Sequence, residues 1–313
     1  MNKILIVLGV LIVVGGGAFL VIKGTSSTYK ADEKAAEVVV EEPIEVEPDG
    51  GIGDGAGPLP EDEEEQGPVS IIGKSVEGRD VTAYHFGTGD KEVLFVGGLH
   101  GGYTPNTSLL AFELVDYLES NPSAVPDDVR VTVIPVVNAD GLYDITGKEG
   151  LFSKNDVTGD DAQRIAARFN ANEVDLNRNF NCLWEEEGTW QSKSVSGGSK
   201  PFSEPEAKAI STYIEGNTPT AVVVYYAAAG GVYASNCKNG MMPETLELTN
   251  VYADASDYSA NEEFDFYEIT GDMVNWLASK KIPAISVLLT DRENTEWSKN
   301  LKGIEAVLNH VAE

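Results

Sequence analysis

The sequence predicts an α/β fold in which a mixed β-sheet lies between two layers of helices. Two observations predict it. Short β-branched runs alternate with longer amphipathic runs along residues 68–313, and the last three of the short runs are almost continuously apolar. Such runs are typical of central strands that helices cover on both faces. We therefore expect a three-layer α/β/α domain.

The period of the apolar residues assigns each element in order. Short apolar runs predict strands at 81–86, 92–97, 129–137, 221–226 and 284–289. Helical spacing of apolar residues predicts helices at 108–119, 204–214, 245–255, 272–279 and 297–311. Ser203, with Glu206 three residues later and Pro205 between them, predicts a capping box at the start of the second helix.

Residues 1–67 differ from the rest of the chain. Residues 4–22 carry no charged side chain, and as a helix they would span roughly 28 Å, which matches a bilayer core. We expect residues 1–30 to form an uncleaved signal anchor; a cleaved signal peptide is the alternative. Residues 31–67 hold 14 acidic residues and one basic residue, so we expect a disordered acidic linker before the domain at 68–313.

The charge balance excludes one class of partner. The chain has 51 acidic and 22 basic side chains, which give a formal net charge of −29. Nucleic-acid binding needs a basic patch, and this composition supplies none, so we expect no nucleic-acid partner.

Two segments carry candidate chemistry. His100 leaves a glycine-rich turn directly after a predicted buried strand, where ligands and catalytic groups are often placed. Residues 168–180 are dense in Asn and Arg, and guanidinium groups bind carboxylates through two parallel hydrogen bonds. The alternatives are a histidine that only fills a tight turn, and a structural pair of Asp175 with Arg178.

Five motifs occur in an order that resembles the zinc metallocarboxypeptidases, the carboxypeptidase A-like family. The resemblance runs from about Gly73 to Ile304, which is nearly all of the domain. The motifs are Gly73-Lys74-Ser75 with Gly78-Arg79, the Gly-Gly-Leu-His-Gly-Gly turn at 97–102, Asn138-Ala139-Asp140-Gly141, Asp175-Leu176-Asn177-Arg178-Asn179-Phe180 and Pro201-Phe202-Ser203-Glu204-Pro205-Glu206.

The resemblance implies a peptide-binding site. Asn177 and Arg178 match the pair that binds the terminal carboxylate of a peptide, and Arg168 matches the arginine that polarises the scissile carbonyl. Tyr267 resembles the tyrosine that closes over the bound end. Val274 falls near the specificity-pocket position and would favour an apolar terminal side chain.

The zinc ligands that the resemblance implies are largely replaced. His100 matches the first ligand, but the second ligand position is Tyr103 or Thr104, and the third is Tyr226. Catalytic zinc generally has three protein ligands. We therefore expect no zinc cofactor unless the site has been rebuilt.

The general base is replaced as well. The glutamate of the family falls on Leu288 or Leu289, near the end of a predicted strand. Without a carboxylate, nothing at this position accepts the proton of an attacking water. No catalytic residue of the family mechanism is then intact.

The two cysteines indicate in which cellular compartment the domain lies. Cys182 and Cys237 lie in loops that the implied fold brings together, which makes a disulfide plausible; two unrelated buried thiols are the alternative. A disulfide needs an oxidising compartment and would place residues 31–313 outside the cytoplasm of a single-pass membrane protein. Four nearby aromatic residues are expected to be core rather than site, namely Trp184, Trp190, Tyr225 and Tyr233.

Three functions remain open from the sequence. The first is a membrane-tethered, catalytically inactive domain that binds peptides or cell-wall glycopeptides through a free C-terminal carboxylate. The second is an active metallocarboxypeptidase with a rebuilt zinc site. The third is an inert scaffold whose acidic surface binds a cationic partner.

Overall fold

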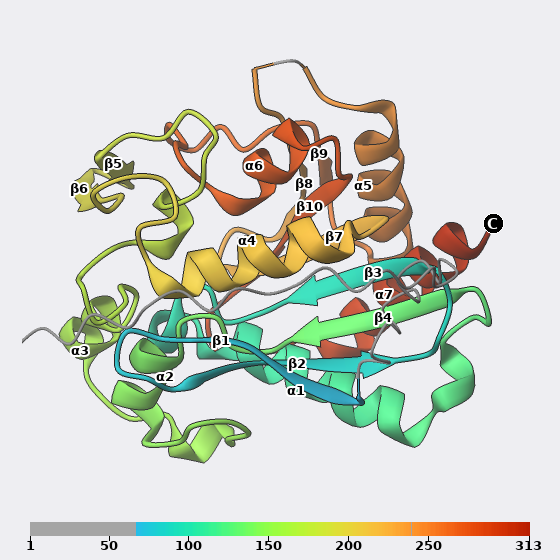
Figure 1. Ribbon diagram of the computed structural model, residues 1–313, viewed down its shortest axis with the longest axis horizontal. Helices are drawn as coiled ribbons and strands as arrows, with labels where there is room; N and C mark the ends of the chain where they lie inside the picture. The colour runs from blue at the N-terminus through green and yellow to red at the C-terminus, as the bar shows by residue number, and fades with distance from the viewer. Residues whose placement is uncertain (1–66, 239) are drawn as a thin grey trace, which may run out of the picture. The chain divides into compact units, whose positions relative to one another are not determined.

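A mixed sheet of eight strands forms the centre of the domain (Figure 1). The structure is a computed structural model that describes residues 67–238 and 240–313. The strand order is β1-β2-β4-β3-β7-β10-β8-β9, and β4, β3, β7 and β10 are mutually parallel. The strands are β1 (Val69–Lys74), β2 (Asp80–Phe86), β3 (Lys91–Val96), β4 (Val129–Ile134), β7 (Ala221–Ala227), β8 (Gly231–Ala234), β9 (Ala260–Asn261) and β10 (Ala284–Leu289).

Helices cover both faces of the sheet. Helices α1, α5 and α7 pack against one face, and α4 and α6 pack against the other. Figure 1 shows α4 in front of the sheet and α1 and α7 behind it. The helices are α1 (Pro105–Ser120), α2 (Ala139–Thr146), α3 (Asp161–Ala166), α4 (Pro205–Asn217), α5 (Pro243–Ser256), α6 (Met273–Ser279) and α7 (Trp297–Ala312).

Alternate side chains of the central strands enter the two cores. In β3, Val93 and Phe95 join the core under α1, α5 and α7, whereas Leu94 and Val96 join the core under α4 and α6. Both faces of such a strand are buried, which is why its sequence is continuously apolar. The predicted α/β class, with a mixed sheet between helices, is confirmed.

Some details differ from the sequence-based prediction. The edge strands β1 and β9, strand β8 beside β9, and the hairpin of β5 (Glu187–Trp190) and β6 (Lys193–Ser196) were not predicted. The predicted capping box is wrong, because Glu204 rather than Ser203 precedes the first turn of α4. Glu206 instead accepts hydrogen bonds from the backbone N–H of Val76 and from Asn170 Nδ2.

The signal anchor and nearly all of the acidic linker expected from the sequence lie outside the described residues. Within 67–238 and 240–313, no helix is long and apolar enough to cross a bilayer.

Candidate functional site

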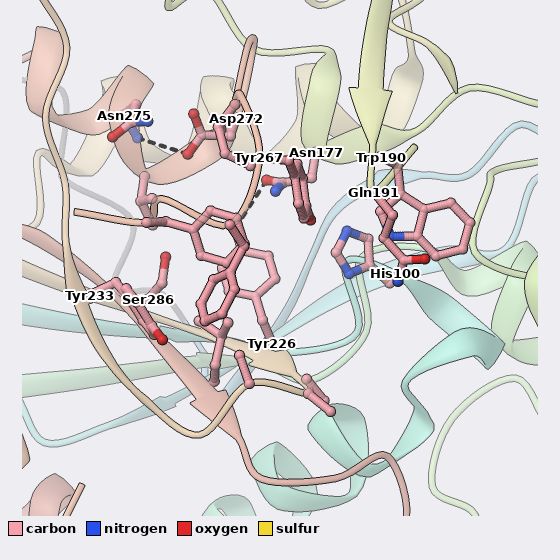
Figure 2. Close-up of a pocket in the computed structure, with 18 of the residues that line it drawn as sticks. His100, Asn177, Trp190, Gln191, Tyr226, Tyr233, Tyr267, Asp272, Asn275 and Ser286 are labelled. Atoms are coloured by element: carbon pink, nitrogen blue, oxygen red, sulfur yellow. Dashed lines mark hydrogen bonds between the residues drawn. The ribbon is translucent and has the colours of Figure 1, made fainter. Parts of the chain in front are cut away.

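A cavity of about 570 Å³ opens at the carboxyl edge of the parallel strands. His100 follows β3, Tyr226 lies near the end of β7, and Leu288 lies near the end of β10; all three line the cavity. Figure 2 shows His100 and Trp190 on one side, Ser286 and Tyr233 on the other, and Tyr226 between them. Ligands of open α/β sheets commonly bind at this edge.

His100 is positioned by the glycine turn after β3. Gly98 has φ +64°, and a Cβ there would lie 2.4 Å from Ser108 Oγ, so the turn needs glycine. The imidazole is buried, and neither ring nitrogen has a hydrogen-bond partner among the described residues; Nε2 lies 3.7 Å from Asp175 Oδ1. Burial, together with the nearby Arg168 charge, lowers the pKa of His100 well below its usual value, so the ring is neutral at pH 7.

Aromatic rings line the cavity beside His100, at positions where the resemblance implies zinc ligands. Tyr103 lines the cavity, whereas Thr104 is buried and does not line it. Tyr226 donates a hydrogen bond of 3.0 Å to Asn177 Oδ1, and its ring centroid lies 5.6 Å from that of His100. Burial raises the pKa of the Tyr226 hydroxyl well above its usual value, so the phenol stays protonated and acts as a donor.

The position where the resemblance implies the general base is apolar. Leu288 lines the cavity, and Leu289 points into the opposite core because successive residues of a strand face opposite sides. Among the described residues, no three His, Cys, Asp or Glu side chains cluster closely enough to hold a metal ion. The donor set around His100 therefore does not fit a zinc ion with three protein ligands.

Arg168 and Asp175 form a buried ion pair at the edge of the cavity. Nε and Nη2 of Arg168 donate to Asp175 Oδ2 at 3.1 and 2.8 Å. The guanidinium also lies 4.4 Å from the ring centroid of Trp190. Burial opposes ionisation of Asp175, but the charges of Arg168 and Arg178 outweigh it and hold its pKa at about 2. The sequence alternative that pairs Asp175 with Arg178 is thus wrong.

Asn177 and Arg178 have different surroundings. Asn177 lines the cavity, and its Oδ1 accepts hydrogen bonds from Tyr226 and from the Met273 backbone N–H. Arg178 is buried and does not line the cavity; its guanidinium donates to the carbonyl oxygens of Asn177 and Thr189. The two residues that the resemblance assigns to one carboxylate therefore do not both face the cavity in this structure.

Tyr267 lies on the cavity wall within an aromatic group. Its ring is 5.0 Å from the ring of Phe264 and 5.9 Å from Arg178 Cζ. Phe266, next to it in the chain, is 63% exposed and also lines the cavity. This wall is apolar and faces solvent.

Sequence reasoning missed polar residues of the cavity. Val274 lines it as expected, but Asp272, Asn275 and Ser286 line it too. Asp272 is buried, which raises the pKa of its carboxyl, and its Oδ1 has no hydrogen-bond partner among the described residues. Ser286 could have been found from the sequence, because it precedes Leu288 by two residues in β10 and shares its face.

Three of the four aromatic residues expected in the core are buried in it, and two of them also line the cavity. Trp190 and Tyr233 do both, Tyr225 lies in the core alone, and half-buried Trp184 donates a hydrogen bond to the Gly197 carbonyl oxygen. Trp190 is in the β5–β6 hairpin, which the sequence pattern did not reveal.

Cys182 and Cys237 form a disulfide, as expected. Their Cα atoms are 6.1 Å apart and the residues are separated by 55 positions. The bridge links the loop after the Asn-Arg segment to the loop after β8, and no free cysteine remains in the chain.

The buried ion pair predicts a specific pH dependence. Because the folded-state pKa of Asp175 is below its unfolded value of about 3.9, its contribution is complete above about pH 4 and is lost as the pH falls through about 2. Asp175→Asn leaves buried Arg168 without its counter-charge, so we expect a loss of about 3–5 kcal/mol of unfolding free energy at pH 7. This difference from wild type should shrink between pH 4 and pH 2 in urea titrations.

The exposed ion pair of Lys280 with Glu215 provides a control. Their charged atoms are 2.7 Å apart, but both side chains are largely in solvent. Glu215→Gln should change the unfolding free energy by less than about 1 kcal/mol. If Asp175→Asn were as stable as the wild type at pH 7, the assigned role of the buried pair would be contradicted.

Comparison with known proteins identifies the family and agrees with the fold. The sequence profile of the family described as zinc carboxypeptidase matches residues 65–306. The catalytic chain of carboxypeptidase N from Homo sapiens is 31% identical over 125 residues, which are 36% of this chain and 25% of the relative. Murein peptide amidase A from Vibrio campbellii is 29% identical over 161 residues, which are 48% of this chain and 61% of the relative. The matched region is thus less than two thirds of either relative.

Solved structures share the fold. The murein-tripeptide amidase of Escherichia coli O157 has a TM-score of 0.53 and 20% identity, covering 79% of this chain and 93% of that chain. Thrombin activatable fibrinolysis inhibitor has a TM-score of 0.61 and 18% identity, covering 78% and 69%. Because the family profile covers most of its length, the chain belongs to the zinc carboxypeptidase family.

Proposed function

We propose that this protein is a non-catalytic member of its family that binds peptides or cell-wall glycopeptides by a free C-terminal carboxylate. The observation that carries the proposal is that two aromatic rings, Tyr103 and Tyr226, line the cavity beside His100, where the resemblance implies zinc ligands. Neither phenol replaces an imidazole or a carboxylate as an ordinary zinc ligand. Leu288 at the position of the base removes the group that would accept a proton from water.

Retention of the cavity favours a binding role over loss of all function. The cavity keeps a volume of about 570 Å³, an aromatic wall and several polar groups, which are common features of ligand sites. The relatives named carboxypeptidase and murein peptide amidase point to peptides as the ligand class. Asn177 lines the cavity and supplies amide donors to a carboxylate, and Arg168, paired with Asp175, lines the cavity beside it.

Zinc stoichiometry tests the non-catalytic part of the proposal. After incubation with excess zinc and desalting, the full chain should retain almost no zinc by mass spectrometry, because His100 is the only imidazole at the cavity. The double variant Tyr103→Glu with Tyr226→His restores the family ligands and should retain about one zinc per chain. One zinc held by wild type and lost in His100→Ala would favour the rebuilt metallocarboxypeptidase instead.

Binding of paired peptides tests the ligand class. We expect tetrapeptides Ala-Ala-Ala-X, with X varied over all amino acids, to bind roughly tenfold tighter as free acids than as amides in calorimetric titrations, because the amide lacks the anionic oxygen. Ser286→Phe fills the cavity and should abolish binding. Exposed Ser194, outside the cavity, provides the control Ser194→Phe, which should bind as wild type does.

Two results would redirect the assignment. Equal affinity for acids and amides would contradict carboxylate recognition. Salt-sensitive binding of a cationic partner that survives Ser286→Phe would favour the scaffold function.

We further propose that the domain is held outside the cytoplasm by a transmembrane helix at 4–22. The charge-free run and the disulfide support this placement, because disulfides persist in oxidising compartments. A reporter enzyme that folds only in such a compartment, fused after Glu313, should be active. Activity of a cytoplasm-dependent reporter at the same position, without activity of the first, would contradict the placement.

A further inference from the structure

We propose that Arg292 is the residue that anchors the ligand carboxylate in this protein. The inference rests on the proposed peptide-binding function and names the charged group that selects the ligand. Arg292 lies in the loop after β10, is exposed, and lines the cavity. Neither the buried strands nor the Asn-Arg segment of the sequence points to it.

Arg292 is the cavity arginine whose guanidinium is not already bonded. Arg168 directs Nε and Nη2 to Asp175, and Arg178 directs both terminal nitrogens to backbone carbonyl oxygens. Within the described residues, Arg292 has no carboxylate within 4.0 Å and no side-chain hydrogen bond. Its donors remain available to a carboxylate, which a guanidinium binds in two parallel hydrogen bonds.

The neighbouring acidic residues do not compete for this guanidinium. Asp291 accepts hydrogen bonds from the backbone N–H groups of Glu293 and Asn294 and from the Asn294 side chain. Glu293 forms an ion pair of 2.9 Å with Arg164. Both carboxylates next to Arg292 in the chain are therefore occupied elsewhere.

An aromatic ring orients the guanidinium. Arg292 Cζ lies 4.3 Å from the ring centroid of Tyr103, within the range of a cation–π contact. The Tyr103 ring is buried and meets the ring of Trp190 edge-on at 5.1 Å. Tyr103 is one of the two residues, with Thr104, at which the family resemblance implies the second zinc ligand, and here its ring positions a protein cation.

Hydrogen bonds join the segment that carries Tyr103 to the loop that carries Arg292. Asn106 follows Tyr103 in the chain, and its Nδ2 donates to the carbonyl oxygens of Asp291 and Asn294 at 2.8 and 3.0 Å. This buried amide joins the segment that carries Tyr103 to the loop that carries Arg292. Such support lowers the conformational entropy that is lost when Arg292 binds a ligand, because the backbone of its loop and the Tyr103 ring that it stacks on are already held in place.

Calorimetric titration of the same acid and amide tetrapeptides with the full chain tests the assignment. Arg292→Ala should weaken binding of the free acid roughly tenfold or more and change amide affinity less than about twofold. Arg292→Lys keeps the charge but loses the two-pronged geometry, so an intermediate loss is expected. Lys193→Ala removes a cation 5.7 Å from the Trp190 ring that does not line the cavity, and it should leave the acid preference unchanged.

Tyr103 is tested as a positioning residue. Its hydroxyl forms no side-chain hydrogen bond among the described residues, so Tyr103→Phe should keep the acid preference, whereas Tyr103→Leu should reduce it. A preference for acids in wild type that survives Arg292→Ala would overturn the inference and leave carboxylate binding in place. Absence of that preference in wild type would instead overturn the proposed function and this inference with it.

Discussion

The site depends on the buried ion pair of Arg168 and Asp175. Charged groups removed from water cost several kcal/mol each unless a partner offsets the loss of hydration. Asp175 supplies that partner: Oδ2 holds Arg168, while Oδ1 accepts the backbone N–H of Asn177 and faces His100. One carboxylate thus constrains the segment that carries the cavity amide, the stacked guanidinium and the imidazole.

Aromatic side chains complete the arrangement that the ion pair begins. Trp190 stacks on Arg168, Tyr103 packs against Trp190, and Tyr226 bonds the Asn177 amide next to His100. These rings limit the water around the polar groups, and electrostatic interactions strengthen where water is limited. The chain has the family fold, and the side chains that line its cavity decide what chemistry the cavity supports. Function therefore has to be argued from these side chains rather than from the fold.

The central strands were predictable because their apolar pattern reflects burial on both faces. Strands β1, β8 and β9 were not predicted. β1 is partly exposed, whereas β8 and β9 are short and form by pairing with segments distant in the chain. The helix cap failed for a similar reason: Glu206 bonds Val76 and Asn170, which only the tertiary structure brings to it. The local sequence predicted that the Glu206 carboxylate would cap the helix, but in the folded protein it accepts hydrogen bonds from residues distant in the chain.

The sequence by itself determined the α/β class and the family, because these follow from periodicity and from motifs read in order. Only the tertiary structure decided which side chains face the cavity. It places Leu288 rather than Leu289 there, directs Arg178 away to backbone carbonyls, and brings Arg292 beside Tyr103. The physical reason is that a side chain's direction depends on the strand face and on hydrogen-bond partners far away in the chain, which a local pattern does not encode.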